Sequence, residues 1–479
     1  MAGDRIAVVG AGAAGTSVLD TLARSVAPTA GTEVTVFDHT GRFGPGRAYR
    51  PCGGTALVNL PATRMSLRPD DARHFQHWLA GGRLGTDHPE FVPRELYGRY
   101  LTEAFAAAAE RLRARTVASR VVAIDRSAGE FRVRTADADV FHADAVFLCV
   151  GTAEPTDAYS LAGTAGYLPD PYPLTRLAGI RADSAVAVLG TGLSAVDAVV
   201  ELAANGHRGV LWMVSRSGYL PGVRDTAAVP VLRYVDPAVV KELATARGGL
   251  SLVDVHQLIR REFAAQGIAV AELWREFQPG EDPAARLRRQ LSQVVHHAPA
   301  LPVFIAVAGV LLHAWRLFDD HTKELVLRHW HGRLSTLCAP MPAVTAARLV
   351  SLIDAGTLRL AAGIRRVRAH ERGFSVELPA GVVAVSHVVN TVRPTPVPVP
   401  GQAVELVDSL LANGLASAHP LGGLRLDGDT GTVLDRAGLP VSGLYALGEL
   451  ATGELYVETT VLTAITHRVQ QAVQTLLGR

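Results

Sequence analysis

Near its beginning the chain reads Arg5-Ile-Ala-Val-Val-Gly10-Ala-Gly12-Ala-Ala-Gly15, a short apolar run that leads directly into three closely spaced glycines. The apolar run predicts a buried strand, and the periodicity after the glycines predicts an amphipathic helix. Glycines at this spacing let the backbone approach a diphosphate at the N-terminus of a helix. The next apolar run ends at Asp38, whose carboxylate can bind a ribose hydroxyl. The sequence therefore predicts a dinucleotide site that contains Gly10, Gly12, Gly15 and Asp38.

The same pattern occurs a second time, in Ala185-Val-Ala-Val-Leu-Gly190-Thr-Gly192-Leu-Ser194-Ala195. The next predicted strand, residues 209–215, is followed by Arg216 and not by a carboxylate. An arginine can pair with a 2′-phosphate that an acidic residue would repel, which favours NADPH over NADH. The alternative is that Arg216 points into solvent. We assign Gly190, Gly192, Ser194 and Arg216 to this second site.

The composition is that of a globular protein with two or three domains. Of the 479 residues 48% are hydrophobic and 19% are charged, which argues against extensive disorder. The formal net charge of +2 comes without a long Lys/Arg block, so we expect no binding to nucleic acid. No CxxC pair occurs among Cys52, Cys149 and Cys338, so a dithiol redox centre is not expected.

A membrane location is not expected either. The N-terminal apolar run leads into a glycine turn and lacks a cleavage site, so a cytoplasmic location is predicted. Residues 290–315 lack Asp, Glu, Lys and Arg, but prolines and histidines interrupt them. We therefore favour a buried helix that starts near Pro302 over a membrane span.

The middle of the chain, about residues 230–350, has a different pattern. Helices are predicted at residues 235–245, 252–266, 283–295, 302–318 and 344–354, and strands resume at 358–361, 374–378 and 385–389. Further helices are predicted at 73–84, 94–115 and 457–477, with a strand pair at 120–125 and 130–135. The fold class expected from these patterns is α/β, with two Rossmann-like dinucleotide-binding domains and a helical insert.

Four blocks make the sequence similar to a known family. They read Phe43-Gly-Pro-Gly-Arg-Ala-Tyr49, Leu57-Val-Asn59-Leu-Pro-Ala-Thr-Arg-Met65-Ser66, Phe75-Gln-His-Trp-Leu79 and Pro93-Arg94-Glu-Leu-Tyr97-Gly-Arg-Tyr100-Leu. With them the chain resembles the bacterial FAD/NAD(P)-binding oxidoreductases, which are related to the class B flavin monooxygenases and the amino-acid N-hydroxylases. The resemblance covers most of the chain except residues 230–330. It implies FAD along Tyr49, Asn59, Met65 and Ser66, with Arg94 and Tyr97 positioning that loop.

The resemblance also implies a division into domains. Residues 1–175 would form the first part of an FAD-binding domain and residues 385–479 its C-terminal part. Residues 176–384 would bind NADPH and carry the helical insert at about 230–350.

Two C-terminal segments match the family's pattern only in part. Gly448-Glu449 resembles a turn that contacts FAD and usually reads Gly-Asp, and the helix after it carries Glu458, a cap or a substrate contact. Asn390-Thr391-Val392-Arg393 stands where N-hydroxylases have Ala-Thr-Gly-Tyr. We take Asn390 and Arg393 as catalytic candidates. Arg393 either binds a substrate carboxylate or forms a surface salt bridge, and we weigh the two equally.

Substrate selection is expected in the helical insert. Trp315, Phe318, Trp330 and Arg333 are candidates there, although aromatic residues at helical spacing more often belong to a core. Together, Arg393 and Arg425 suggest an anionic, amino-acid-like substrate. No metal is predicted, because the sequence has no HExxH motif, CxxC pair or EF-hand loop, and His296, His297, His329 and His331 lack accompanying Cys or carboxylate spacing.

The resemblance implies an NADPH-dependent flavin monooxygenase that N-hydroxylates a small amine or amino acid in specialised metabolism. It would use molecular oxygen through a C4a-hydroperoxyflavin, so that no protein nucleophile is required. One alternative is a flavin-dependent dehydrogenase or reductase without oxygen insertion, and another is a non-catalytic flavin-binding redox sensor. The sequence does not decide whether the protein is a monomer or a homo-oligomer.

Overall fold

The computed structural model describes residues 5–26, 31–82, 88–152, 154–224, 230–278, 280–393, 399, 401–456 and 462–478. Contacts within the chain define two compact units. Unit 1 comprises Met1–Gly54, Leu60–Glu154 and Arg393–Arg479, and unit 2 comprises Thr55–Asn59 and Pro155–Val392. The short segment Thr55–Asn59 thus belongs with unit 2, although it lies within the first predicted domain.

Unit 1 is built on a six-stranded sheet in the order β18-β19-β7-β1-β2-β3. Its strands are β1 (Arg5–Val9), β2 (Glu33–Phe37), β3 (Arg115–Val117), β7 (Ala145–Leu148), β18 (Thr432–Leu434) and β19 (Pro440–Ala446). All neighbours pair in parallel except β18 and β19. The central strands are short apolar runs that are buried on both faces, as expected of a parallel sheet covered on both sides.

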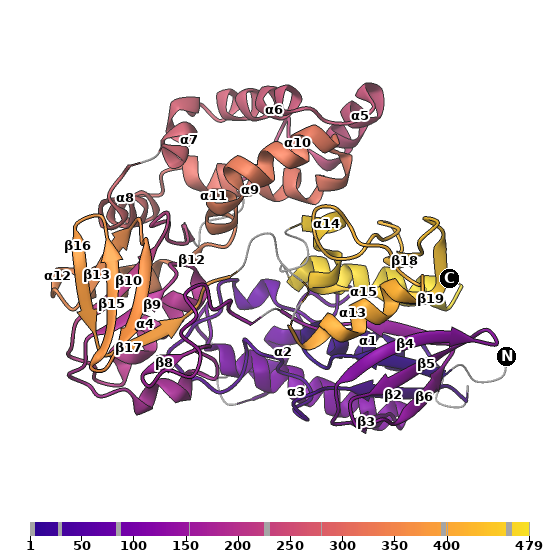
Figure 1. The fold of residues 1–479 in the computed structure, drawn as a ribbon. Coiled ribbons are helices and arrows are strands. Elements are labelled where there is room, and N and C mark those ends of the chain that lie inside the picture. Colours follow the sequence, from indigo (N-terminus) through magenta and orange to yellow (C-terminus); the bar gives the residue numbers. More distant parts are fainter. Residues whose placement is uncertain are drawn as a thin grey trace. The chain divides into compact units, whose positions relative to one another are not determined.

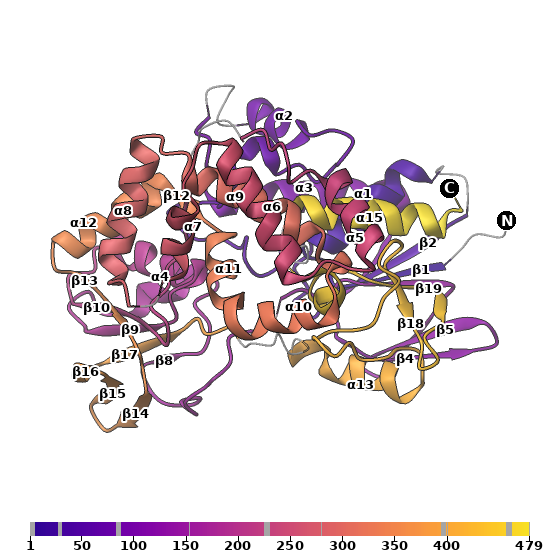
Figure 2. The same cartoon turned by 90° about the horizontal axis from the view of Figure 1, so that it is seen from above.

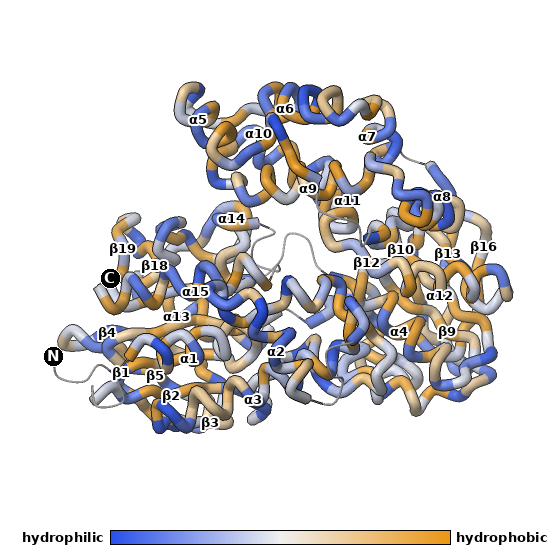
Figure 3. The backbone as a smooth tube through the Cα atoms, turned by 180° about the vertical axis from the view of Figure 1, so that it is seen from behind, coloured by the Kyte–Doolittle hydropathy of each residue, from blue (hydrophilic) through white to orange (hydrophobic). Residues whose placement is uncertain are grey.

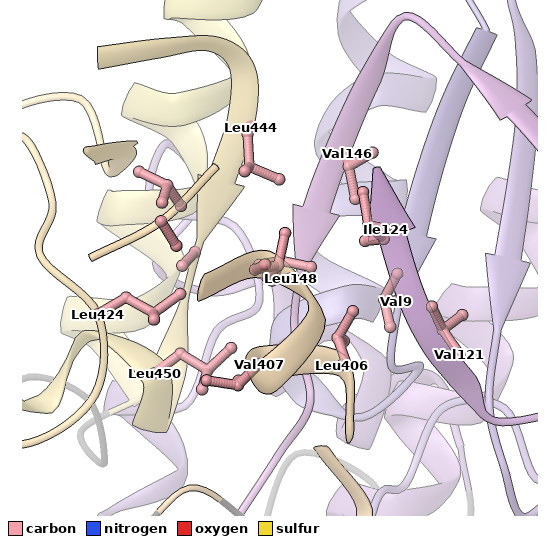
Figure 4. Packing of buried hydrophobic residues seen from close by; sticks show 14 of the residues in the cluster. Val9, Val121, Ile124, Val146, Leu148, Leu406, Val407, Leu424, Leu444 and Leu450 are labelled. Atoms are coloured by element: carbon pink, nitrogen blue, oxygen red, sulfur yellow. The ribbon is translucent and has the colours of Figure 1, made fainter. Parts of the chain in front are cut away.

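Helices cover one face of this sheet, and a small second sheet with one helix covers the other. On the first face lie α1 (Ala13–Ser25), α3 (Arg94–Leu112) and α15 (Leu462–Leu476), with α1 and α15 side by side (Figure 1). The second face packs against β4 (Val121–Ser127), β5 (Glu130–Thr135), β6 (Val140–Ala143) and α13 (Val404–Ala412). Figure 4 shows Leu148 of β7 and Leu406 of α13 within this second core.

Unit 2 repeats this plan. Its five-stranded parallel sheet has the order β13-β10-β9-β17-β8, formed by β8 (Tyr167–Leu168), β9 (Val186–Leu189), β10 (Leu211–Ser215), β13 (Leu358–Ala362) and β17 (His387–Asn390). The antiparallel meander of β14 (Arg366–His370), β15 (Gly373–Leu378) and β16 (Gly381–Val385) packs against it. Helix α4 (Leu193–Ala204) follows β9, as α1 follows β1 in unit 1. The predicted α/β class with two Rossmann-like units is confirmed.

The helical insert, whose helices are labelled from α5 to α11 in Figures 1 and 2, also belongs to unit 2. It contains α5 (Pro237–Arg247), α6 (Leu252–Ala265), α7 (Val270–Phe277), α8 (Pro283–Val295), α9 (Ala300–His313), α10 (Asp320–Leu325) and α11 (His331–Leu337), and α12 (Ala343–Asp354) leads back to the sheet. Side chains cap four of these helices: Asp236, Ser251, Asp282 and Asp319 each accept a hydrogen bond from a first-turn N–H group. These caps explain why the predicted starts of α6 and α8 agree with the structure.

The remaining elements are short. They are α2 (His74–Gly81), α14 (Thr452–Leu455), β11 (Val223–Arg224), β12 (Met341–Pro342), the 3₁₀ turns η1 (Ala62–Arg64), η2 (Leu174–Gly179), η3 (Trp315–Leu317), η5 (Gly401–Ala403) and η6 (Gly448–Ala451), and the π-helical η4 (Val326–Trp330).

Two sequence predictions need correction. The strand expected at 385–389 is two strands, since β16 ends at Val385 in antiparallel pairing and β17 begins at His387 in parallel pairing. The helix expected at 302–318 starts at Ala300 and ends at His313. The sequence prediction missed α13 and β14. Of the predicted final helix, residues 457–461, including Glu458, lie outside the described residues.

Helix α9 is hydrophobic along most of its length (Figure 3). Within the described residues no single helix is long and apolar enough to cross a membrane. Among the described helices, only α8 and α9 counted together reach the length and apolar composition of a membrane span, and they are bent by 96° at the break between them.

The core of unit 1 can be tested at Leu148, which is fully buried between β1 and β19. Leu148→Ala removes buried methyl groups and leaves a cavity, so we expect a loss of about 2–5 kcal/mol in the free energy of unfolding. Denaturant unfolding followed by circular dichroism measures this loss. Leu439→Ala is the control, because Leu439 is 63% exposed and its truncation should change stability by less than about 0.5 kcal/mol.

Candidate functional site

The first glycine turn of unit 1 closes tightly on the end of β7. Gly10 has φ +101°, and a Cβ atom there would lie 2.0 Å from the carbonyl oxygen of Cys149. A Cβ atom at Gly15 would lie 1.9 Å from the carbonyl oxygen of Gly10. Only glycine fits these two positions, so the backbone itself forms the surface of the turn.

Helix α1 starts directly after this turn, with Gly12 as its N-cap. Among the described residues no side chain caps it, and its first turn carries no acidic residue. Its first N–H groups therefore suit an anion, because they have no partner within the helix and lie at the positive end of the helix dipole.

The carboxylate of Asp38 borders the same turn. Its Oδ2 accepts a hydrogen bond from the backbone N–H of Ala11 at 3.2 Å, and its Oδ1 accepts one from the Thr40 hydroxyl at 2.6 Å. Oδ1 also accepts a bond from the N–H of Thr40 at 2.8 Å, so Oδ2 is the oxygen with room for one more. Asp38 thus stands where a ribose hydroxyl of a dinucleotide on this turn could reach it.

The second glycine turn, in unit 2, has the same construction. Gly190 has φ +111°, and a Cβ atom there would lie 2.4 Å from Oγ1 of Thr391, which follows β17. Helix α4 starts after Gly192, again without a side-chain cap or a first-turn carboxylate among the described residues, and Ser194 lies in that first turn. Arg216 follows β10 and is exposed.

The residues predicted to lie along the flavin fall into two groups. In unit 1, Met65 is 2% exposed and the Ser66 hydroxyl lies 2.6 Å from the carbonyl oxygen of Asp71, so both hold their own loop together. The ring of Tyr49 packs edge-on against Tyr97 at 4.9 Å between centroids. Burial raises the pKa of Tyr49, and Arg94 opposes this in part. Whether these residues touch a flavin stays a prediction.

Asn59 lies in unit 2, where it lines a small cavity together with Leu193 of the first turn of α4. The cavity is also lined by Thr55, Ala56, Leu57, Val196, Asp197, Val200, Met341, Pro342 and Thr345. This places Asn59 beside the second glycine turn.

Two buried carboxylates of α4 were missed by the sequence analysis. Asp197 is 4% exposed and accepts a hydrogen bond from the Tyr172 hydroxyl at 2.6 Å. Glu201 is 3% exposed and accepts one from the Thr55 hydroxyl, which fastens the segment Thr55–Asn59 to α4. The available signal was the pair of acidic residues four positions apart on an otherwise apolar helix.

Arg393 forms an ion pair with Glu449 within unit 1. Its Nη2 lies 2.5 Å from Oε1 of Glu449, whose side chain is 1% exposed, whereas that of Arg393 is 51% exposed. Of the two roles considered for Arg393, the structure contains the salt bridge, and its carboxylate end is buried. The longer side chain of Glu449, compared with the usual Asp, is thereby accommodated after Gly448, which has φ +71°.

Asn390 supports the backbone around it. It is 1% exposed, its Nδ2 donates to the carbonyl of Thr156 at 3.1 Å, and its Oδ1 accepts from the N–H of Val392 at 3.1 Å. This geometry favours a positioning role over direct catalysis. The same holds for Trp315, which is 1% exposed and packs on Phe318, as expected of a core residue.

Arg425 is exposed in unit 1, and its backbone bonds to Ser417 and Leu434 fix its loop. Trp330 is half-buried in unit 2. No group of three His, Cys, Asp or Glu side chains that could hold a metal ion occurs among the described residues.

The fold is that of FAD/NAD(P)-binding proteins. Residues 7–153 match the family model described as FAD-NAD(P)-binding. No curated protein sequence matches the chain. Among solved structures, the chain resembles an ornithine N-hydroxylase from Kutzneria sp. 744, solved with reduced FAD, NADP⁺ and L-ornithine, at a TM-score of 0.59 and 16% identity, over 100% of this chain and 99% of that one.

Two further solved structures are similar over nearly their whole length. An L-lysine 6-monooxygenase from Pseudomonas syringae matches at a TM-score of 0.58 and 17% identity, over 99% of each chain. A cadaverine monooxygenase from Erwinia amylovora, bound to FAD, matches at 0.58 and 14% identity, over 99% of this chain and 94% of that one. At such identities the likeness establishes the fold and leaves the reaction to be argued from the site.

The first turn can be tested by adding the missing Cβ atom. Gly10→Ala would collide with the carbonyl of Cys149 and strain a backbone at positive φ, so the purified variant should retain less than about a tenth of the wild-type flavin. The ratio of absorbance at 450 and 280 nm measures flavin content. Gly129→Ala is the matched control, because Gly129 has φ +89° but has no neighbour within 4 Å and lies between β4 and β5. Equal flavin loss in both variants would contradict a specific role for Gly10.

The role of Arg393 can be tested in a second pair of variants. Arg393→Ala removes a partner of a buried carboxylate, and we expect about 1–3 kcal/mol less stability, part of which Arg393→Ala combined with Glu449→Gln should restore. Denaturant unfolding of the single and double variants measures this. A variant with unchanged stability and a raised substrate KM would instead support the substrate-binding role.

Proposed function

We propose that this protein is an NADPH-dependent flavin monooxygenase that N-hydroxylates a small amine or amino acid. The observation that carries the proposal is the pair of glycine turns, one in each unit, each leading into a helix without a capping or first-turn carboxylate among the described residues. The chain is similar over nearly its full length to an ornithine N-hydroxylase, an L-lysine 6-monooxygenase and a cadaverine monooxygenase, and this similarity supports the choice of reaction. A place in specialised metabolism and in the cytoplasm is part of the same proposal.

In this proposal unit 1 binds FAD and unit 2 binds NADPH. Gly10, Gly12 and Gly15 let the FAD diphosphate approach the N-terminus of α1, and Asp38 accepts a ribose hydroxyl. The turn from Gly190 to Gly192 does the same for NADPH, with Arg216 near the 2′-phosphate. Bound FAD would supply the redox chemistry, taking a hydride from NADPH and passing two electrons to oxygen.

The cysteines give little support to a reductase that would work through a redox-active dithiol. Cys52 and Cys149 are both buried, and burial raises the pKa of the Cys149 thiol, which disfavours the reactive thiolate. The carbonyl of Cys149 instead closes the first glycine turn. The experiment below distinguishes a flavin reductase that works without protein thiols from the monooxygenase.

The reaction is tested with the purified, flavin-bound protein. Under anaerobic conditions NADPH should bleach the flavin absorbance, and ¹⁸O₂ added with ornithine, lysine or cadaverine should give a product two mass units heavier than the ¹⁶O₂ product. Fast bleaching, followed by formation of hydrogen peroxide and no oxygenated product from any amine in a broad panel, would favour the reductase. No bleaching by NADPH would favour the non-catalytic redox sensor.

The nucleotide preference is tested at Arg216, which is exposed directly after β10. Arg216→Ala removes a charge-assisted bond to the 2′-phosphate, so Kd for NADPH should rise about 10- to 100-fold while that for NADH stays within about twofold. Anaerobic titration of flavin reduction measures both constants. Equal weakening for both nucleotides would refute the assignment of Arg216.

A further inference from the structure

The loop after β10 is fastened to the second glycine turn. The hydroxyl of Thr191, the middle residue between Gly190 and Gly192, donates to the carbonyl of Tyr219 at 2.7 Å and lies 3.0 Å from the Ser215 hydroxyl. The Ser215 hydroxyl in turn accepts from the N–H of Gly218 at 2.9 Å. Tyr219 is therefore held directly beside the turn that the proposed function assigns to NADPH.

The same loop is bound to the helical insert. Beyond Tyr219, the N–H of Gly222 donates to the carbonyl of Thr336 at 3.0 Å, and β11 pairs with β12. On the other side, a Cβ atom at Gly218 would lie 2.9 Å from the ring of Pro283, the first residue of α8. Helices α8 and α11 thus both reach this loop, within one compact unit.

Two arginines from these helices lie over the Tyr219 ring. The guanidinium carbon of Arg333 in α11 is 4.7 Å from the ring centroid, and that of Arg286 in α8 is 5.2 Å from it. Cation–π contacts of this kind hold a guanidinium in place while leaving its N–H groups available to an anion.

The two arginines differ in their charge balance. Arg286 is 6% exposed and bonds through Nη2 to Glu276 at 3.2 Å, so its charge is compensated, although its buried Nη1 has no hydrogen-bond partner among the described residues. Arg333 is half-buried, and its side chain has no carboxylate partner among the residues that the structure describes. Arg216, which lies three residues before Tyr219, also has no carboxylate partner in the described part of the chain.

Among the described residues, Arg333 over the Tyr219 ring and Arg216 three residues before Tyr219 therefore both lack a carboxylate partner, and α4 begins without a side-chain cap. Such charges usually have a carboxylate or an anionic ligand nearby, and the planar guanidinium fits the geometry of both carboxylate and phosphate. A dinucleotide on the Gly190 turn would bring phosphate groups to this place.

We propose that Arg333, held over the Tyr219 ring, binds a phosphate group of the nicotinamide dinucleotide together with Arg216. The helical insert then forms part of the dinucleotide site, and Arg333 is a cofactor-binding residue and not the substrate residue considered from sequence. Arg286 is a positioning residue that supports the ring from α8. This inference rests on the proposed use of NADPH and names a residue that the glycine pattern does not predict.

The experiment measures Kd of NADP⁺ and NAD⁺ by calorimetry on the full-length, flavin-bound protein and on its Arg333→Gln and Arg216→Ala variants. Arg333→Gln should raise Kd of NADP⁺ about 10- to 100-fold and reduce the dependence of log Kd on log salt. A loss confined to NADP⁺ assigns Arg333 to the 2′-phosphate, and an equal loss for NAD⁺ assigns it to the diphosphate. Arg333→Lys, which keeps a point charge, should recover part of the affinity.

Arg328→Gln is the matched control. Arg328 lies in η4, directly before α11, has a side chain that is 69% exposed, and pairs weakly with Glu324 at 4.0 Å, so its loss should leave both Kd values unchanged. Tyr219→Phe should keep NADP⁺ affinity and Tyr219→Leu should lower it, because only the former retains the ring under Arg333.

The possible failures are distinguishable. Wild-type-like binding of NADP⁺ by Arg333→Gln, combined with weakened binding by Arg216→Ala, would overturn this inference and leave the proposed function standing. A wild-type protein that binds neither nucleotide would overturn both. A loss of affinity without a change in salt dependence would also overturn it, since that result would mean that Arg333 has only a structural role.

Discussion

The structure depends on one steric constraint, which occurs once in each unit. At Gly10 the carbonyl oxygen of Cys149 occupies the place of a Cβ atom, and at Gly190 the side chain of Thr391 does so. The backbone can make the sharp change from strand to helix only because both residues are glycines at positive φ. Each helix thereby begins directly after a turn whose glycines carry no side chain, which is where a diphosphate can approach.

The repeated chain path explains why the constraint has the same form twice. In both units a meander follows the last strand of the first half of the sheet and returns the chain to the strand beside the glycine turn, β7 in unit 1 and β17 in unit 2. The residues after that strand must therefore abut the glycine. Thr391 stands at this point in unit 2, and Asn390 directly before it, at the end of β17, is buried and bonds to neighbouring backbone groups.

Buried acidic groups fix distant segments to the helices that follow the turns. Asp20 in α1 is 3% exposed and pairs with Arg68 at 2.7 Å, and Glu201 in α4 accepts a hydrogen bond from Thr55. A buried carboxylate is costly unless it is bonded, so these partners specify which loop lies on which helix. The loops that carry the predicted flavin residues are positioned in this way, one on each unit.

The sequence by itself determined the features that depend on neighbouring residues. The two glycine turns, the strand that ends at Asp38, the position of Arg216 after β10 and the bounds of α8 all follow from short-range pattern, capping and glycine conformation. Only the tertiary structure decided the pairs Arg393 with Glu449 and Arg333 with Tyr219, the place of Asn59 beside α4, and the split of residues 385–389 into two strands. The physical reason is that an ion pair, a ring contact or a change of strand partner is set by which distant segments meet, and hydrophobic periodicity carries no record of that.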